Sequence, residues 1–263
     1  MSPKKLFSVL FLLATCCLPA TAQRMQKIEA DLDSAYEWIA RSTWFSDDRN
    51  GKGVIDEDTV ADKNEAFQRK LLMYTSKYPA TIAWPFNSLK KTITGILTAD
   101  DGLFRIYNWD DLTGGTMRYY RSVFQFKSGN KVHSCLLPHR DTLTDGGDMG
   151  YAFRKLYTLK TGRQVYYLAT YIQVGSSRDF GAGIKAFTIS NGSLIDTALI
   201  IKTKTGMHSE LFYGFENNVK SSDHSIYYDS RTKTIFIPVV IEATVTNRYI
   251  KYRFNGTCFE KVE

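Results

Sequence analysis

The segment LFRIYNWDDLTGGTMRYYRSVFQF, residues 103–126, decides the fold class. Two runs rich in β-branched and aromatic residues, Leu103 to Trp109 and Met117 to Phe126, flank a polar segment that contains Gly114 and Gly115. Runs of this kind separated by turn residues are typical of two strands joined in a hairpin. The segment therefore predicts antiparallel β-structure at the centre of the chain.

The same pattern continues to the C-terminus. Further strand-like runs cover Gln164 to Gln173, Lys233 to Ile241 and Arg248 to Phe254. Turn signals separate them at Gly129-Asn130, Thr161-Gly162, Asn191-Gly192, Ser230 to Lys233 and Asn255-Gly256. No helical pattern of useful length interrupts these runs, so an antiparallel meander is favoured over parallel βαβ units. Pro238 lies inside a run, which predicts an edge strand or a bulge there.

Some of these runs are apolar on one face only, and others, such as Val165 to Ile172, are apolar on both faces. Strands of both kinds in one chain indicate stacked sheets, in a sandwich-like or a propeller-like arrangement.

Helical periodicity is confined to the N-terminal part of the chain. Apolar residues recur at helical spacing from Arg24 to Arg41, and a second helix is expected from Val60 to Lys77, with Pro79 ending it. The predicted fold class is α+β, mainly β, with N-terminal helices packed on an antiparallel β meander. The predicted organisation is a helical segment over residues 23–79 and a β domain over residues 80–263.

Residues 1–22 have the layout of a secretory signal peptide. Lys4 and Lys5 precede an apolar stretch from Leu6 to Leu18, and the small-x-small sequence Ala20-Thr21-Ala22 follows it. This pattern predicts export, to the periplasm or the medium, with cleavage after Ala22. A lipoprotein would instead be cut before Cys16, but Thr15 is bulky for the residue before that cut, so the Ala22 site is favoured.

The charge pattern bears on the choice of partner. Without Lys4 and Lys5 the formal net charge falls from +7 to about +5, and the charges are dispersed along the chain. There is no basic stripe, and export points away from nucleic acid as a partner. No apolar stretch after the signal approaches the ~20 residues of a membrane-spanning helix. The expected partner is an exported protein or a small ligand that the sequence does not identify.

Cys135 and Cys258 are the cysteines outside the predicted signal. In an exported protein such a pair can form a disulfide, and the alternative is two buried free thiols. The sequence does not contain the geometry that would decide between them.

One part of the chain resembles a known group. Residues Tyr74-Thr75, Pro79 and Trp84-Pro85-Phe86, followed by the 104–117 hairpin, resemble a group of bacterial secreted proteins of unknown function. That group carries a YT…P.T…YPF helix end followed by a RIYSWDTxTGGTMH hairpin. Here Asn108 stands in place of the Ser, and Arg118 in place of a more common His. The resemblance covers about residues 70–130, and it implies the architecture without implying a mechanism.

The hairpin turn is the first candidate site. It brings Arg105, Trp109, Asp110, Asp111 and Arg118 close to one loop, which is compatible with a polar ligand site that uses Trp109 as a stacking face. The alternative is a purely local role, in which the aspartates cap the turn backbone and the two glycines supply positive φ.

The second candidate is the loop over residues 138–148. Its residues His139, Asp141, Asp145 and Asp148 have side chains that could bind a divalent cation. Their spacing fits no defined metal loop, and a solvated loop is the alternative, so we expect no metal and no cofactor.

Residues 48–59 resemble a calcium-binding loop. Lys52 stands where an oxygen ligand is required and Thr59 stands where a bidentate Glu is required, which favours an inter-helix linker.

Sequence motifs for catalysis are absent. There is no GxSxG, HExxH or phosphate loop, and the four histidines are scattered. The expectation is an exported, non-enzymatic binding or interaction module that uses the loops of a β scaffold. The alternative is an exported hydrolase with a carboxylate and histidine site in the loops of residues 109–148. A concave pocket that holds two or more of these carboxylates and a histidine would favour the hydrolase, whereas exposed, separated positions would favour the binding module.

Overall fold

The computed structural model describes residues 3–41, 57–137, 148–162, 164–216 and 225–263. Helices occupy the N-terminal part: α1 (Pro3–Arg41), α2 (Glu57–Lys77), the 3-10 helix η1 (Pro79–Ile82) and the short α3 (Leu89–Thr92). Strands fill the remainder, so the α+β, mainly β prediction is confirmed. No helix in the described ranges is long and apolar enough to cross a membrane.

The strands form three sheets, which we call A, B and C. Sheet A contains β1 (Gly95–Thr98), β2 (Phe104–Asp110), β3 (Tyr120–Ser128) and β4 (Lys131–Cys135). Sheet B has the spatial order β11 (Glu210–Glu216), β7 (Asp179–Ser190), β6 (Val165–Val174) and β5 (Ala152–Lys160), and β8 (Ser193–Ile195) also pairs with β7. Sheet C has the order β10 (Gly206–His208), β9 (Ile201–Thr203), β15 (Phe259–Val262), β14 (Thr244–Phe254), β13 (Thr234–Ile241) and β12 (Tyr227–Asp229).

The predicted turns join neighbouring antiparallel strands. The Asn191-Gly192 pair connects β7 to β8, and Asn255-Gly256 connects β14 to β15. Pro238 lies at a register shift between β13 and β14, which confirms the predicted bulge. Within the described residues one strand pair is parallel, β15 with β9.

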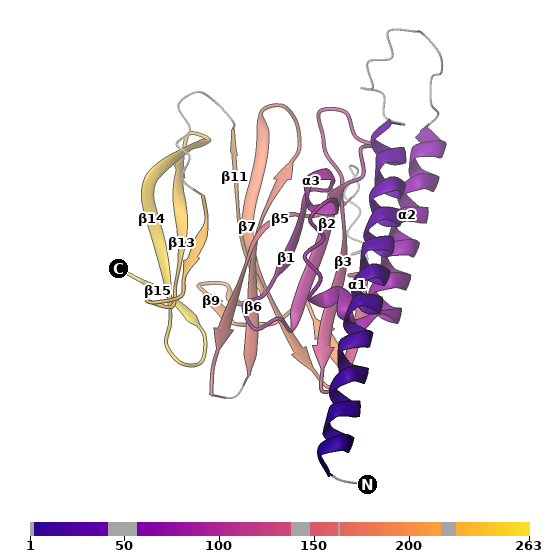
Figure 1. Ribbon diagram of the computed structural model, residues 1–263. Helices are drawn as coiled ribbons and strands as arrows, with labels where there is room; N and C mark the ends of the chain where they lie inside the picture. Colours follow the sequence, from indigo (N-terminus) through magenta and orange to yellow (C-terminus); the bar gives the residue numbers. More distant parts are fainter. Residues whose placement is uncertain (1–2, 42–56, 138–147, 163, 217–224) are drawn as a thin grey trace.

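The elements stack in four layers (Figure 1), with α1 and α2 on one face of sheet A, sheet B on its other face, and sheet C beyond sheet B. Alternation along β2 explains this placement, because successive side chains of a strand point to opposite faces. Tyr107 and Trp109 pack with the helices, whereas Phe104 and Ile106 pack against sheet B. Of the two predicted arrangements, the stacked sheets correspond to the sandwich-like one.

The helices contribute buried stripes to the core that they share with sheet A. Met25, Ile28, Leu32 and Ile39 of α1 are buried, as their helical spacing predicts, and Phe67 is among the buried residues of α2. The helix α1 begins at Pro3, before the predicted cleavage site, and its N-terminal end projects beyond the sheets (Figure 1). Within residues 20–41 of α1, burial begins at Met25.

The disulfide between Cys135 and Cys258 is not formed. Both cysteines are free thiols. Cys135 ends β4 in sheet A, and Cys258 directly precedes β15 in sheet C, so sheet B lies between the two thiols. The hypothesis of a bridge is therefore wrong, and the alternative of two free thiols holds.

Candidate functional site

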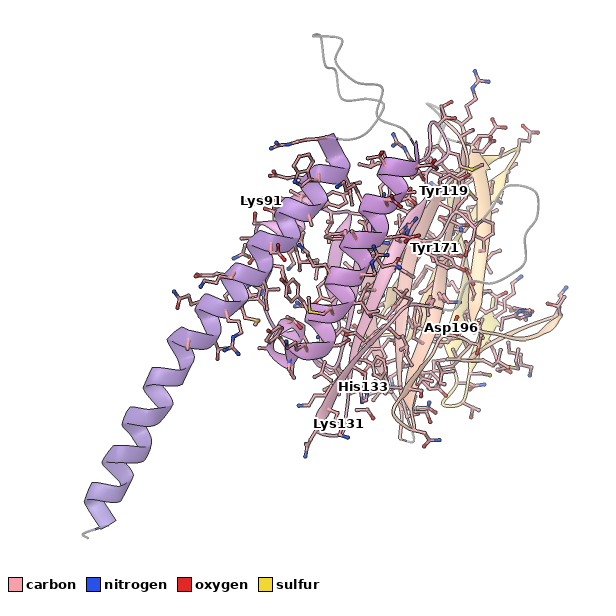
Figure 2. All side chains as sticks on the ribbon, turned by 90° about the vertical axis from the view of Figure 1, so that its right-hand side faces the viewer. Lys91, Tyr119, Lys131, His133, Tyr171 and Asp196 are labelled. Carbon is pink, nitrogen blue, oxygen red and sulfur yellow. The ribbon has the colours of Figure 1, made fainter. Side chains whose placement is uncertain are left out.

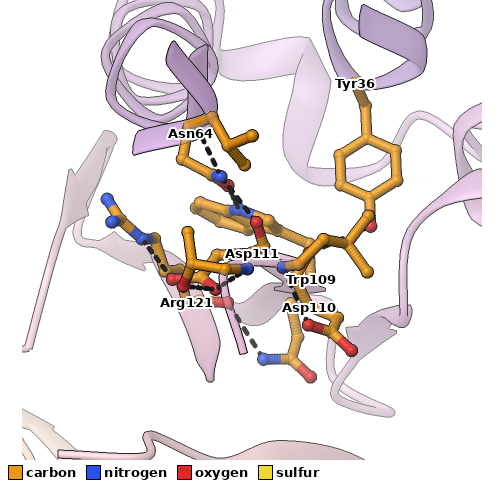
Figure 3. Close-up of polar contacts among 10 residues, drawn as sticks. Tyr36, Asn64, Trp109, Asp110, Asp111 and Arg121 are labelled. Carbon is orange, nitrogen blue, oxygen red and sulfur yellow. Dashed lines mark hydrogen bonds and ion pairs between the residues drawn. The ribbon is translucent and has the colours of Figure 1, made fainter. Parts of the chain in front are cut away.

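The Trp109 side chain belongs to the core between the helices and sheet A (Figure 3). It is fully buried, its Nε1 donates to Asn64 Oδ1 at 3.1 Å, and its ring meets Phe67 edge-on at 5.1 Å between centroids. Asn64 Nδ2 in turn donates to the Asp111 carbonyl at 2.7 Å. The indole therefore has no exposed face on which a ligand could stack.

The two aspartates after Trp109 both cap the turn. Asp110 Oδ1 accepts the Leu112 amide at 2.9 Å, and Asp111 Oδ1 accepts the Thr113 amide at 3.0 Å. Asp111 Oδ2 also accepts Arg121 Nε at 3.2 Å. Burial raises the pKa of Asp110, and the backbone hydrogen bond of Leu112 opposes that shift. Both carboxylates therefore have the turn-capping role that was the alternative to a ligand site.

The glycine pair in this turn is explained by the lack of room for a side chain and not by a positive φ. Neither Gly114 nor Gly115 has positive φ, whereas Leu112 has a φ of 59°. A Cβ added to Gly114 would lie 2.1 Å from the Met117 carbonyl oxygen. The predicted positive φ at the glycines is wrong, and Gly114 is required because the chain approaches itself closely there.

The two arginines of the first candidate site lie far from one another in the structure. Arg105 is buried on the helix face of sheet A, where it donates to the carbonyls of Thr81 and Trp84 at 2.8 and 2.6 Å. Arg118 lies 3.6 Å from Asp110 Oδ2 at the turn. Arg105 therefore connects η1 to sheet A and lies away from the turn.

The second candidate loop is described only at its end. His139, Asp141 and Asp145 lie outside the described residues, while Asp148 is exposed and accepts the Gly150 amide with Oδ1 at 2.9 Å. Gly150 has a φ of 63°, and a Cβ there would lie 2.0 Å from the Tyr120 carbonyl oxygen. Glycine is thus required where this segment passes β3. The calcium-like loop, residues 48–59, lies largely outside the described residues as well.

A cavity of about 470 Å³ lies where the ends of both candidate loops meet. Its lining comes from α2, the start of β3, the segments after β4 and before β5, and β7. Of the sequence-predicted residues that the structure describes, Asp111 and Asp148 line it. The polar and aromatic residues of the lining are Glu65, Gln68, Arg69, Asp111, Tyr119, Tyr120, Arg121, Ser122, Phe124, Asp148, Tyr151, Phe153, Lys185 and Asp196. Tyr119 lies above Asp196 in the view of Figure 2.

One side chain fixes the spacing of the sheets beside the cavity. Asn108 is fully buried on the sheet B side of β2, and its Nδ2 donates to the carbonyls of Arg121 and Tyr151 at 3.0 and 2.7 Å. Its Oδ1 accepts the Phe153 amide at 3.1 Å. Asn108 therefore connects sheet A to the start of β5, so that Arg121 and Tyr151 flank the cavity at fixed positions.

The innermost charged group of the cavity is Lys185. It is fully buried on β7, and its Nζ lies 3.7 Å from both Asp196 Oδ2 and Glu210 Oε2. The ammonium also lies 5.7 Å from the ring centroid of Tyr151. The Tyr171 hydroxyl (labelled in Figure 2) donates to Glu210. Two carboxylates thus compensate a buried cation that would otherwise be strongly unfavourable.

The arrangement of the strands explains why the carboxylates meet at Lys185. β11 pairs with the first part of β7, up to Lys185, and β8 pairs with the last part, from Thr188. Glu210 opens β11 opposite Lys185, and Asp196 directly follows β8. The two carboxylates therefore approach the lysine from the two strands that share one edge of β7.

Lys185, Asp196 and Glu210 are not among the site residues predicted from the sequence. A signal was available, because Lys185 interrupts the run FGAGIKAF, which is otherwise free of charge. A lysine in the middle of a fully apolar strand needs compensating carboxylates. The identity of those carboxylates depends on strand pairing, which the local pattern does not contain.

The thiol near this cluster is not activated. Burial, and to a smaller extent the charge of Asp196, raise the pKa of Cys135 to about 11. A thiol with such a pKa stays protonated at neutral pH and is a poor nucleophile. Within the described ranges no group of three or more potential metal-ligating side chains is found.

Comparison of the chain with protein families, with curated proteins and with solved structures finds no match. The site is therefore defined by its own geometry and chemistry.

Proposed function

We propose that this chain is an exported binding module that takes a small ligand into the cavity between α2, sheet A and sheet B. The main support for the proposal is the cavity itself. Asp111 from the first candidate loop and Asp148 from the second both line it. Its volume of about 470 Å³ lies within the roughly 300–1,000 Å³ of typical ligand pockets. Aromatic walls with a few fixed charges are also typical of such pockets.

The surroundings of the cavity support binding because they hold its walls in place. Asn108 ties Arg121 and Tyr151 together, and Asp111 fixes Arg121 through its Oδ2. A preformed pocket binds at a lower cost in conformational entropy than one that must be ordered by its ligand.

The alternative function, an exported hydrolase, has weaker support. Both carboxylate oxygens of Asp111 accept hydrogen bonds from the protein itself, from Thr113 and Arg121. Histidine is absent from the described lining residues, and the Cys135 thiol is held protonated. A general base with a free carboxylate oxygen is therefore not found at Asp111.

Export is part of the proposal, with cleavage after Ala22. In its support, residues 20–24 of α1 are exposed or half-buried, and the buried stripe that starts at Met25 lies after the predicted cleavage site. Intact-mass analysis of the exported protein should give a chain that begins at Gln23. A lipid-modified chain that begins at Cys16 would contradict this cleavage site.

A cavity-filling variant tests the proposed function. Leu136 lines the cavity and is 38% exposed, so that Leu136→Trp should occupy part of its volume without disturbing the core. Leu103→Trp is the matched control, because Leu103 is 36% exposed and lies outside the lining. Ligand-observed NMR would screen a library that contains cationic, neutral and anionic small molecules against the wild type and both variants.

The expected result is a set of compounds that bind the wild type and Leu103→Trp and lose binding to Leu136→Trp. Compounds that bind all three proteins equally, or a screen without binders, would contradict a small-ligand function for this cavity.

A further inference from the structure

The edge of β3 that faces the cavity lacks one backbone partner. β4 pairs with β3 only as far as Phe124, which lies opposite Cys135. At the start of β3, the Tyr120 amide instead donates to the Met149 carbonyl at 2.9 Å. Ser122 lies between these two contacts, and among the residues that the structure describes no backbone group pairs with it on this side. The edge is therefore open at one residue.

The hydrogen bonds between β2 and β3 show where the backbone groups of Ser122 point. Along antiparallel strands, residues alternate between bonding to the partner strand and facing away from it. The Asp111 amide donates to the Tyr119 carbonyl at 2.9 Å. The Lys127 amide donates to the Leu103 carbonyl at 2.8 Å, so the odd-numbered residues of β3 bond to β2. The N–H and C=O of Ser122 therefore point away from β2, on the side where β4 has ended.

The chain that would continue β4 leaves β3 at this point. Leu137 would be the next residue to lie opposite Ser122, but β4 ends at Cys135 and no backbone hydrogen bond joins Leu137 to Ser122. Ser122 and Leu137 both line the cavity. Asn108 Nδ2 donates to Ser122 Oγ at 2.9 Å, which holds the open residue in place. A strand edge of this kind is a template for pairing with another extended chain.

A residue paired with Ser122 would place its side chain among aromatic rings. Paired residues of antiparallel strands project from the same face, and Ser122 lies opposite Asn108 on the sheet B face of sheet A. The lining of the cavity includes Tyr120, Tyr151 and Phe153. An apolar or aromatic side chain therefore suits this position.

We propose that the cavity binds a short extended peptide, one residue of which pairs with Ser122. The N–H of that residue donates to the Ser122 carbonyl, and its C=O accepts the Ser122 amide. Strand addition of this kind gains affinity from main-chain hydrogen bonds and specificity from the side-chain pockets. This inference rests on the proposed function, because it names the ligand class of the same cavity.

Two probes that differ in a single N–H group test the inference. N-acetyl-L-phenylalanine N-methylamide carries the N–H and C=O of one peptide residue, and its ester analogue has an oxygen in place of the acetylated N–H. Isothermal titration calorimetry should show roughly ten-fold tighter binding of the amide probe, because the ester has no donor for the Ser122 carbonyl. Equal binding of the two probes, or no binding of the amide probe, would overturn the inference.

A pair of substitutions at Ser122 tests the other hydrogen bond. Ser122→Pro removes the backbone N–H and Ser122→Ala keeps it, while both lose the hydroxyl that accepts Asn108. Proline is tolerated in a strand where the N–H faces away from the partner strand. The proline variant, with its fold checked by circular dichroism, should bind the amide probe roughly ten-fold more weakly than the alanine variant. Equal affinities of the two variants would contradict the pairing.

Amide hydrogen exchange tests the pairing in the wild-type protein, without any substitution. In the free protein the Ser122 amide should exchange faster than the amides of Arg121 and Val123, which bond to β2. Saturation with the amide probe should slow the exchange at Ser122 by about ten-fold or more. A Ser122 amide that is already protected in the free protein, or that the probe leaves unprotected, would refute the inference.

The cavity-filling variant separates this inference from the proposed function. Library compounds that bind the wild type and lose binding in Leu136→Trp would show that the proposed function stands even where the amide probe fails. If no compound behaves in this way and the amide probe fails, both the inference and the proposed function are wrong.

Discussion

The two faces of sheet A are built from alternate residues of the same strands, yet their polar groups have different roles. On the helix face, the polar atoms of Arg105 and Gln125 hydrogen-bond to η1 and the end of α2, and water is excluded. On the sheet B face, an aromatic cluster around Phe104 and Phe124 ends at a cavity with charged walls, to which Glu65, Gln68 and Arg69 of α2 also contribute. One face is closed and the other is open at one end.

The difference between the two faces shows that a dense group of polar and aromatic residues in the sequence does not by itself define a ligand site. The segment from Trp109 to Asp111 is the densest such group, and its hydrogen bonds join it to Asn64 of α2 and cap its own turn. The charged groups that line the cavity come from residues far apart in the chain, such as Glu65, Arg121 and Lys185.

The largest expected loss of stability is on the helix face of sheet A. Trp109→Ala removes a fully buried ring and its hydrogen bond to Asn64, so it should lower the free energy of unfolding by about 3–5 kcal/mol. Trp38→Ala, at a residue that is 60% exposed, should change it by less than about 1 kcal/mol. Urea unfolding followed by circular dichroism measures both, and equal effects would show that Trp109 is not a core residue.

A smaller loss is expected where the two sheets join. Asn108→Ala removes the hydrogen bonds that Asn108 makes to the part-buried carbonyl of Tyr151 and to the buried amide of Phe153, which should cost about 2–4 kcal/mol. The exposed Asn247 provides the control, since Asn247→Ala should be nearly neutral. Because Asn108 also positions the cavity wall, ligands found by screening should bind this variant more weakly. Unchanged binding would refute the positioning role.

Asp111→Asn should destabilise the protein by about 2 kcal/mol, because it replaces a charge-assisted hydrogen bond to Arg121 by a neutral group. Asparagine keeps an oxygen for the Thr113 amide, so the turn itself should persist. Thermal unfolding at low and high salt measures the loss. A variant as stable as the wild type would mean that the Arg121 pair contributes nothing.

The neighbouring Asp110→Asn should have the opposite sign and the smallest magnitude. Burial raises the pKa of Asp110 in the folded protein above its ordinary value of 3.8, so ionisation at neutral pH disfavours folding. The amide variant should therefore be more stable at pH 7, by less than about 1 kcal/mol. The gain should vanish as the pH falls through the folded pKa towards 3.8, where the wild-type carboxyl becomes protonated. A gain that grows at acidic pH would contradict the direction of this shift.

The sequence contains enough information for most of the fold because its signals are local. Strand runs such as Gln164 to Gln173, the Asn-Gly turns and the helical stripe from Met25 to Ile39 each appear where expected, since side-chain periodicity and turn chemistry act between near neighbours. The helix α2 begins slightly before its expected start at Val60.

The cavity was only partly predictable. Asp111 and Asp148 were identified because both lie in loops with evident polar density. Lys185, Asp196 and Glu210 were missed because their meeting depends on β7 being shared between β8 and β11. Trp109 and Arg105 were misleading because the sequence does not show which face of β2 is covered by helices.

The most direct test of the central claim, that the open end of sheet A is the ligand site, is a map of amide chemical-shift changes. A compound selected by the library screen would be titrated into the isotope-labelled protein. We expect the largest changes at Tyr120, Tyr151 and Lys185 around the cavity. Changes centred on the helix face, at Thr81 and Tyr107, or scattered over the surface would contradict it.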